Sequence, residues 1–173
     1  VGSGKTTLAT ALAQRFAATH ISSDVTRKRL AGLPETEHHY DEPSSGIYSP
    51  EFDRKTYGAI LEQSRELLKM GNSVILDAAF LKQSERERAI TMAQESGANY
   101  VVAECRLSPE LTQKRLLQRL KEASASDGRW EIYQRQSKWF EPVNELSSEH
   151  YILIDTSQSL AQNIGCINDR MDW

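Results

Sequence analysis

Cysteine is scarce in this sequence of 173 residues: Cys105 and Cys166 are the only two, and neither lies in a motif with metal-ligand spacing. We therefore expect no cysteine-based metal site. Cys105 lies in an apolar run, which favours a buried structural thiol over a reactive one. A reducing cytoplasm is the simplest compartment for such a chain.

Long apolar runs are also missing. No stretch approaches the roughly 20 residues that a membrane-spanning helix needs, and no apolar segment follows a basic start as in a signal peptide. The net charge is only −3, so nucleic acid would have to be bound by a local basic patch. We expect one domain over residues 1–173, with a single core, no internal repeats and no membrane partner.

Helical and strand-like periodicities alternate along the chain. We expect strands at 20–23, 73–76, 100–105 and 151–154, and helices at 5–17, 24–31, 50–70, 84–96, 109–121, 129–139 and from 160 onward. Ser49 and Pro50 provide a cap and a first-turn proline, and Asp127 is the expected cap of the helix at 129–139. This alternation predicts an α/β fold, a three-layer sandwich in which helices cover both faces of a parallel sheet, with a small lid at about 119–130.

The most specific motif opens the chain and matches the C-terminal part of the phosphate-binding pattern G-x-x-x-x-G-K-[ST]. Its residues are Gly2, Ser3, Gly4, Lys5, Thr6 and Thr7. Glycines let backbone N–H groups converge on phosphate oxygens, and the start of the following helix adds partial positive charge. Lys5 can reach the β- and γ-phosphates, and the Thr6 hydroxyl can ligate Mg²⁺. We therefore expect ATP and Mg²⁺ as cofactors; the alternative is a glycine-rich turn before an ordinary helix.

The beginning of this motif is not in the sequence. Its first glycine would lie two residues before Val1, and the strand that leads into such a loop would also precede Val1. We expect an N-terminally truncated domain whose first, central strand is missing. A domain cut from a longer chain and a partial sequence would both give this pattern.

Two absent motifs narrow the class of P-loop protein. Asp77 ends an apolar run and is followed by Ala78 and Ala79, where a water-activating ATPase usually has an Asp-Glu pair. The guanine-reading segment Asn-Lys-x-Asp is absent as well. A kinase needs other groups: a carboxylate beside the acceptor hydroxyl, and cations over the phosphoryl group that is transferred.

Candidates for these kinase groups follow two of the expected strands. Asp24 comes directly after the strand at 20–23, and the C-terminal ends of such strands face the ligand crevice. We expect Asp24 to handle the acceptor proton, and Arg27, three residues on, to bind an anionic group of the acceptor. Asp77 could hold Mg²⁺ through water or orient Arg27. The structural alternatives are helix caps for the two aspartates and a surface position for Arg27.

Arginines on the helix at 109–121 supply the expected cations. Arg115 and Arg119 are four residues apart and share one helix face next to the small polar segment of the expected lid. We expect Arg119 to close over the phosphates as a catalytic residue and Arg115 to contact the nucleotide; a solvated helix face is the alternative. Arg129 and Arg135 are weaker candidates.

The chain resembles the predicted-kinase family of P-loop proteins, often described as an AAA domain and related to polynucleotide kinase, gluconate kinase and zeta toxin. The resemblance extends over nearly the whole chain. The segments that carry it are 2–7, 23–32, 48–51, 74–80, 124–127 and 139–142. It is similar in particular to the ATP-binding domain that follows an aminoglycoside-phosphotransferase-like domain in bacterial fusion proteins, which implies a fused upstream domain.

The resemblance to polynucleotide kinase implies roles for matching positions. Asp24 would be the catalytic base, Arg27 the arginine that binds the acceptor phosphate, Asp77 the aspartate after the third strand, and Arg119 the lid arginine. The acidic loop at 33–48 departs from that family's substrate elements, so a nucleic-acid end is not the favoured acceptor.

Three functions follow as hypotheses. The favoured one is phosphoryl transfer from Mg²⁺-ATP to a hydroxyl of a small molecule. The second changes the acceptor to a polynucleotide 5′-hydroxyl, against which the sequence pI of about 5.9 counts mildly. The third is a nucleotide-binding regulatory module that hydrolyses ATP slowly and serves a fused partner.

The missing strand leads to a prediction about stability. A polypeptide of residues 1–173 alone should be badly destabilised, because the strand that this fold class buries at its centre is not in the sequence. Thermal unfolding followed by circular dichroism tests this expectation. Cooperative unfolding in the ordinary range of about 45–65 °C would contradict it.

Overall fold

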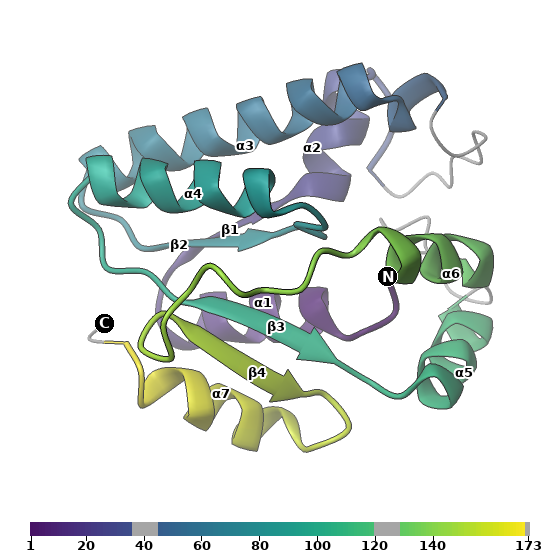
Figure 1. The fold of residues 1–173 in the computed structure, drawn as a ribbon. Coiled ribbons are helices and arrows are strands. Elements are labelled where there is room, and N and C mark those ends of the chain that lie inside the picture. The colour runs from purple at the N-terminus through teal and green to yellow at the C-terminus, as the bar shows by residue number, and fades with distance from the viewer. Residues whose placement is uncertain (36–44, 120–128, 172–173) are drawn as a thin grey trace.

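Helices and strands alternate along the chain in the computed structural model, which describes residues 1–35, 45–119 (without the side chain of Arg119) and 129–171 (Figure 1). In chain order the elements are α1 (Lys5–Arg15), β1 (Thr19–Ser22), α2 (Ser23–Leu30), the 3₁₀ helix η1 (Gly46–Tyr48), α3 (Pro50–Lys69), β2 (Val74–Asp77), α4 (Gln83–Glu95), β3 (Val102–Arg106), α5 (Pro109–Arg119), α6 (Trp130–Trp139), β4 (Tyr151–Asp155) and α7 (Leu160–Asn168). The expected order of elements is thus confirmed. Most of the expected lid at 119–130, Asp127 included, lies outside the described residues.

Local signals explain several helix starts. The Ser49 hydroxyl accepts the Phe52 N–H at 3.3 Å, and Pro50 occupies the first turn of α3 as predicted. The Ser22 hydroxyl accepts the Val25 N–H at 3.4 Å at the start of α2. At the start of α6, Arg129 occupies the N-cap position and makes no capping hydrogen bond through its side chain, while the predicted cap, Asp127, is not among the described residues.

All strand pairing is parallel, as predicted, but the strands form two pairs rather than one continuous sheet. β1 pairs with β2, with Ser22 opposite Asp77, and β3 pairs with β4, with Cys105 opposite Ile154. Among the described residues no strand joins β2 to β3. A cavity of about 850 Å³ lies between the two pairs, lined largely by apolar residues of α1, β2, α4 and β3. The described strands are therefore divided into two parallel pairs at this cavity.

Each strand pair has its own hydrophobic cluster. Ile21, Tyr57 and Ile60 belong to the cluster that α3 and α4 form over β1 and β2, while Leu8 and Ile154 belong to the one that α1 and α7 form with β4. Figure 1 shows α3 and α4 on one side of the molecule and α7 on the opposite side. The layers thus agree with the predicted arrangement of helices on both faces.

The pleat of β2 divides its side chains between the clusters. Val74 and Leu76 pack with the first cluster, whereas Ile75 packs with the second. Because successive side chains alternate between faces, Asp77 shares the face of Ile75, on the side of α1. This places the Asp77 carboxylate beside the start of α1.

Cys105 packs against the second cluster, as the sequence suggested. Burial raises the pKa of its thiol to about 11, so the thiol is protonated and unreactive at neutral pH. None of the helices in the described ranges is long and apolar enough to cross a membrane.

A substitution at Ile60 can test the packing of the first cluster, because the Ile60 side chain is 0% exposed. Replacing it with alanine (Ile60→Ala) should lower the free energy of unfolding by about 2–5 kcal/mol through lost burial and a residual cavity. Met70→Ala, at the exposed end of α3, should change it by no more than about 0.5 kcal/mol. Urea denaturation of the two variants measures both values, and equal losses would contradict the packing described here.

Candidate active site

The loop before α1 has the geometry of an anion cradle. Gly2 and Gly4 have φ angles of 74° and 84°, in the left-handed region. A Cβ at Gly2 would lie 2.9 Å from the Thr112 Cγ2 atom, and one at Gly4 would lie 3.2 Å from the Arg115 Nη1 atom. Both positions therefore favour glycine for conformation, and Gly2 favours it for space as well. α1 begins directly after Gly4 with no side-chain cap and no acidic residue in its first turn, so its first N–H groups can receive an anion.

A pocket of about 750 Å³, which we call the P-loop pocket, opens beside this loop. α1 contributes Lys5 and Thr6, and α2 contributes Asp24 and Arg27. Asp77 comes from the end of β2. Further lining residues on α3, α4 and α6 include Asp53, Tyr57, Glu85 and Arg135. The pocket therefore joins the loop to residues that lie far apart in the sequence.

Asp77 is the most buried carboxylate of this pocket, at 7% exposure. Burial alone raises the pKa of Asp77. Hydrogen bonds from His20 and Thr6, together with the charge of Lys5, outweigh that effect and bring the pKa below its ordinary value. Asp77 is therefore ionised at neutral pH, on the α1 side of β2. The Thr6 hydroxyl and this carboxylate are hard oxygen groups of the kind that Mg²⁺ prefers.

At a site of this kind, the protein supplies only some of the ligands of a magnesium ion. The described residues contain no group of three or more His, Cys, Asp or Glu side chains that could hold a metal ion together. Mg²⁺ commonly keeps several waters and is bound through one or two protein oxygens together with substrate phosphates. Thr6 and Asp77 fit that mode of binding.

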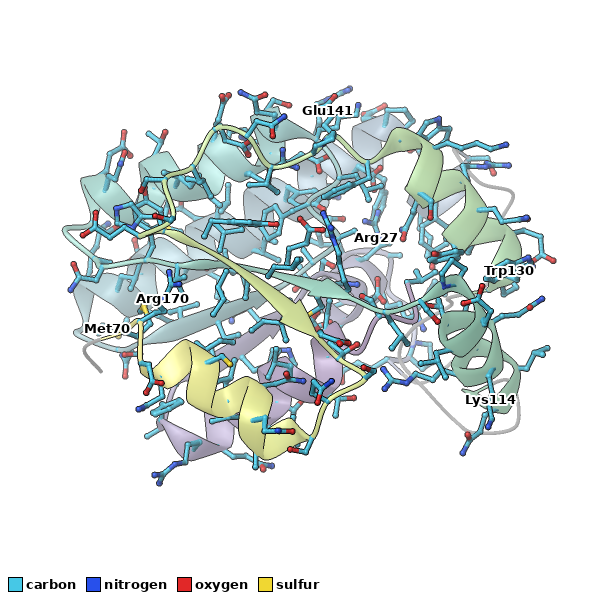
Figure 2. All side chains as sticks on the ribbon, turned by 60° about the horizontal axis from the view of Figure 1, so that its bottom comes forward. Arg27, Met70, Lys114, Trp130, Glu141 and Arg170 are labelled. Carbon is cyan, nitrogen blue, oxygen red and sulfur yellow. The ribbon has the colours of Figure 1, made fainter. Side chains whose placement is uncertain are left out.

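Arg27 is buried, so the alternative of a surface arginine is wrong. Its Nη1 atom lies 2.6 Å from the Asp53 Oδ1 atom and donates to the Ile47 carbonyl at 2.8 Å, and its guanidinium stacks over Tyr48. Figure 2 shows Arg27 in the interior, whereas Lys114 projects outward from α5. The Arg27 Nε–H is a buried donor with no acceptor among the described residues. A bound molecule could supply that acceptor.

The predicted site residues fall into three groups. Gly2, Gly4, Lys5, Thr6, Asp24, Arg27 and Asp77 line the P-loop pocket together. Ser3 lines the apolar cavity between the strand pairs instead, and the exposed Thr7 lines neither space. The helical turn explains the position of Thr7, because consecutive residues at a helix start point in different directions.

The two predicted arginines of α5 differ in what can be described. Arg115 lies beside Gly4, and its Nη2 atom donates to the Thr156 carbonyl at 2.8 Å. The protein thus holds Arg115 next to the loop, but it is not among the residues that line the pocket. Arg119 ends α5, and its side chain lies outside the described residues.

Sequence reasoning missed Tyr57, a residue of the pocket wall. The Tyr57 hydroxyl accepts the Phe80 N–H at 3.1 Å, and Arg86 Nη1 donates to the Phe80 carbonyl at 3.0 Å. Phe80 has a φ of 42°, which is rare for a residue with a Cβ, so these two contacts hold a strained turn just after Asp77. Tyr57 falls on the apolar face of α3, and nothing in the sequence separates it from the core residues around it.

Two more acidic residues and a histidine belong to this region. Burial is the largest influence on Glu85 and raises its pKa. Asp53 pairs with Arg27, and His20 contacts Asp77. His20 could have been found from the strand period, because it lies two residues before Ser22 and therefore on the same face of β1.

Comparison with known proteins shows which family model and which solved structures this chain is similar to. The sequence model of a family described as an AAA domain matches residues 1–143. A gluconokinase from Sinorhizobium meliloti 1021 has a TM-score of 0.62 at 20% sequence identity, covering 95% of this chain and 83% of its own. A sugar kinase from Janibacter sp. HTCC2649 has a TM-score of 0.68 at 18% identity, covering 99% and 89%.

A third solved structure, a candidate kinase from Chloroflexus aurantiacus j-10-fl, has a TM-score of 0.71 at 16% identity, covering 98% of this chain and 93% of its own. At these identities the likeness shows the fold, an α/β architecture with parallel strands. No curated protein matches the sequence.

A substitution at Lys5 can test whether the loop before α1 binds phosphate. Lys5→Ala should weaken ATP binding by about 10- to 100-fold, since one charge-assisted contact to phosphate contributes about 1.5–3 kcal/mol. Lys69→Ala, which removes an exposed lysine at the end of α3, should leave the affinity unchanged. Isothermal titration calorimetry with ATP measures both, and an unchanged affinity in Lys5→Ala would remove Lys5 from the phosphate site.

Proposed function

The chain belongs to the AAA domain family, and on that premise we propose that it is an ATP-dependent kinase that phosphorylates a hydroxyl of a small molecule. One observation carries the proposal. The P-loop pocket contains the anion cradle at Lys5 and Thr6 together with a carboxylate, Asp24, and a buried arginine, Arg27. Phosphoryl transfer needs this combination, because it depends mainly on positioning and electrostatic stabilisation.

Each group has a proposed role in the reaction. The loop N–H groups and Lys5 bind the β- and γ-phosphates of ATP. Mg²⁺, when bound through Thr6 and water on Asp77, neutralises charge on the phosphate oxygens. Asp24 accepts the proton of the acceptor hydroxyl, whose oxygen bonds to the γ-phosphorus as the bond to the bridging oxygen breaks, and ADP leaves.

Three arginines complete the proposed site. We assign Arg27 to the acceptor, which its unpaired Nε–H supports. Arg115 is placed near the nucleotide, as its position beside Gly4 supports. Arg119 is assigned to the charge that develops on the transferred group, and this role rests on its place on the helix beside the expected lid and on the family resemblance.

The acceptor class is supported by the neighbours and by the pocket. The gluconokinase and the sugar kinase among the structural neighbours act, by their names, on small hydroxylated compounds. A pocket of about 750 Å³ can enclose the end of a nucleotide and a molecule of that size. A cytoplasmic location and a fused aminoglycoside-phosphotransferase-like domain upstream belong to the same proposal, and both rest on sequence reasoning.

A screen with γ-labelled ATP tests the acceptor class. Sugar acids, aldoses, polyols and 5′-hydroxyl oligonucleotides should be compared at low and high salt. We expect label on a small molecule. Label on an oligonucleotide, with strongly salt-dependent binding, would select a polynucleotide kinase instead. Slow ATP hydrolysis that no acceptor changes would indicate a regulatory nucleotide-binding module.

Asp24 tests the chemical step. Asp24→Asn should lower kcat by about 10²-fold or more while ATP affinity stays nearly unchanged, because the variant cannot take the acceptor proton. Asp169→Asn, at the exposed end of α7, is the matched control and should keep full activity. Steady-state kinetics and ATP titration are the measurements. Equal turnover in Asp24→Asn and the unmodified protein would exclude Asp24 from the mechanism.

A further inference from the structure

His20 makes a contact that the proposed mechanism does not use. It lies in the middle of β1, and its Nε2 atom is 3.4 Å from the Asp77 Oδ2 atom. The side chain of His20 is 22% exposed and that of Asp77 only 5%. His20 does not line the P-loop pocket, whereas Asp77 does. His20 therefore lies behind the pocket wall and touches a carboxylate that lines it.

The strand pairing explains why these two side chains meet. β1 and β2 are in parallel register, with His20 opposite Ile75 and Ser22 opposite Asp77. His20 and Asp77 are diagonal neighbours on one face of the pair, and long side chains reach across that diagonal. Ile21, between His20 and Ser22, packs into the cluster on the opposite face. The contact is therefore fixed by backbone pairing and not by a flexible loop.

In the hydrogen bond between His20 and Asp77, the histidine is the donor. An ionised carboxylate only accepts hydrogen bonds, so His20 must carry its proton on Nε2 and donate to Oδ2. The Thr6 hydroxyl and the Lys5 ammonium act on the same carboxylate from α1. A carboxylate held from β1 on one oxygen and from α1 by these groups has little freedom to rotate.

We propose that His20 is a positioning residue for the nucleotide-bound magnesium site: it holds Asp77 Oδ2 and so orients the remaining lone pairs of Asp77 toward Thr6 and the metal-bound water. Mg²⁺ demands near-ideal octahedral geometry, so the orientation of a carboxylate beside it matters. Groups that orient such carboxylates typically contribute 10- to 100-fold to metal affinity. The inference rests on the proposed nucleotide site but not on the identity of the acceptor.

A structural role alone is the competing explanation. A histidine that merely satisfies a buried carboxylate would affect the stability of the protein but not the coupling between Mg²⁺ and ATP. The two explanations therefore differ in a binding measurement. That measurement is the ratio of the ATP dissociation constants with excess EDTA and with saturating Mg²⁺, determined by calorimetry on the full-length protein.

His20→Leu removes the donor and should lower this ratio by about 10- to 100-fold, with little change in the affinity measured in EDTA. His20→Gln keeps an N–H donor at a similar reach and should restore most of the ratio. Thr19→Val, at the neighbouring position on the other face of β1, is the matched control and should keep the ratio of the unmodified protein.

A double-mutant cycle separates action through Asp77 from an independent effect. If His20 acts through Asp77, then adding His20→Leu to Asp77→Asn causes no further loss in the ratio. Additive losses would overturn the inference, as would a folded His20→Leu protein with an unchanged ratio. If His20→Leu does not fold, a reduced ratio in His20→Gln equal to that in Asp77→Asn would overturn it as well.

The proposed function fails in a different way. An unmodified chain that does not bind ATP, or that binds it equally well with and without Mg²⁺, would remove the nucleotide site itself and the role of His20 with it. Normal Mg²⁺ coupling in the unmodified chain, together with no effect of His20→Leu, would remove only the positioning role.

Discussion

The parallel register of β1 against β2 is the constraint on which the site depends. It sets Ser22 opposite Asp77, so two strands end side by side at the start of α1. Asp24 follows β1 by two residues, and His20 precedes its end by two, on the face that carries Asp77. A shift of one residue would turn the Asp77 side chain to the opposite face and into the apolar cluster of α3 and α4. The apolar side chains on that face therefore fix the register and, with it, the polar site.

Two ion pairs join segments that are distant in the sequence. Arg27 and Asp53 connect α2 to α3 beside the pocket. Arg86 and Glu145 have exposures of only 2% and 9%, and they hold the segment after α6 against α4. Removing one partner of a buried pair such as Arg86–Glu145 typically costs about 3–5 kcal/mol, because the other charge is left without compensation. Of the two pairs, Arg27–Asp53 belongs to the lining of the P-loop pocket and holds that wall in place.

The turn after β2 shows how the same side chains serve structure and site. Phe80 has a left-handed backbone, and both of its backbone polar groups bind side chains, those of Tyr57 and Arg86. Tyr57 is also part of the cluster under α3 and lines the P-loop pocket. Packing of the cluster therefore determines the position of the loop that continues from Asp77 into the pocket wall.

The sequence by itself determined the order of helices and strands, the start of α3 at Pro50, and the phosphate loop around Gly4 and Lys5. These features depend on neighbours along the chain: periodicity, helix capping and glycine conformation. Only the tertiary structure decided that Arg27 is buried against Asp53 and that His20 reaches Asp77. Those outcomes depend on strand register and on contacts between distant segments, for which a single sequence carries no local signal.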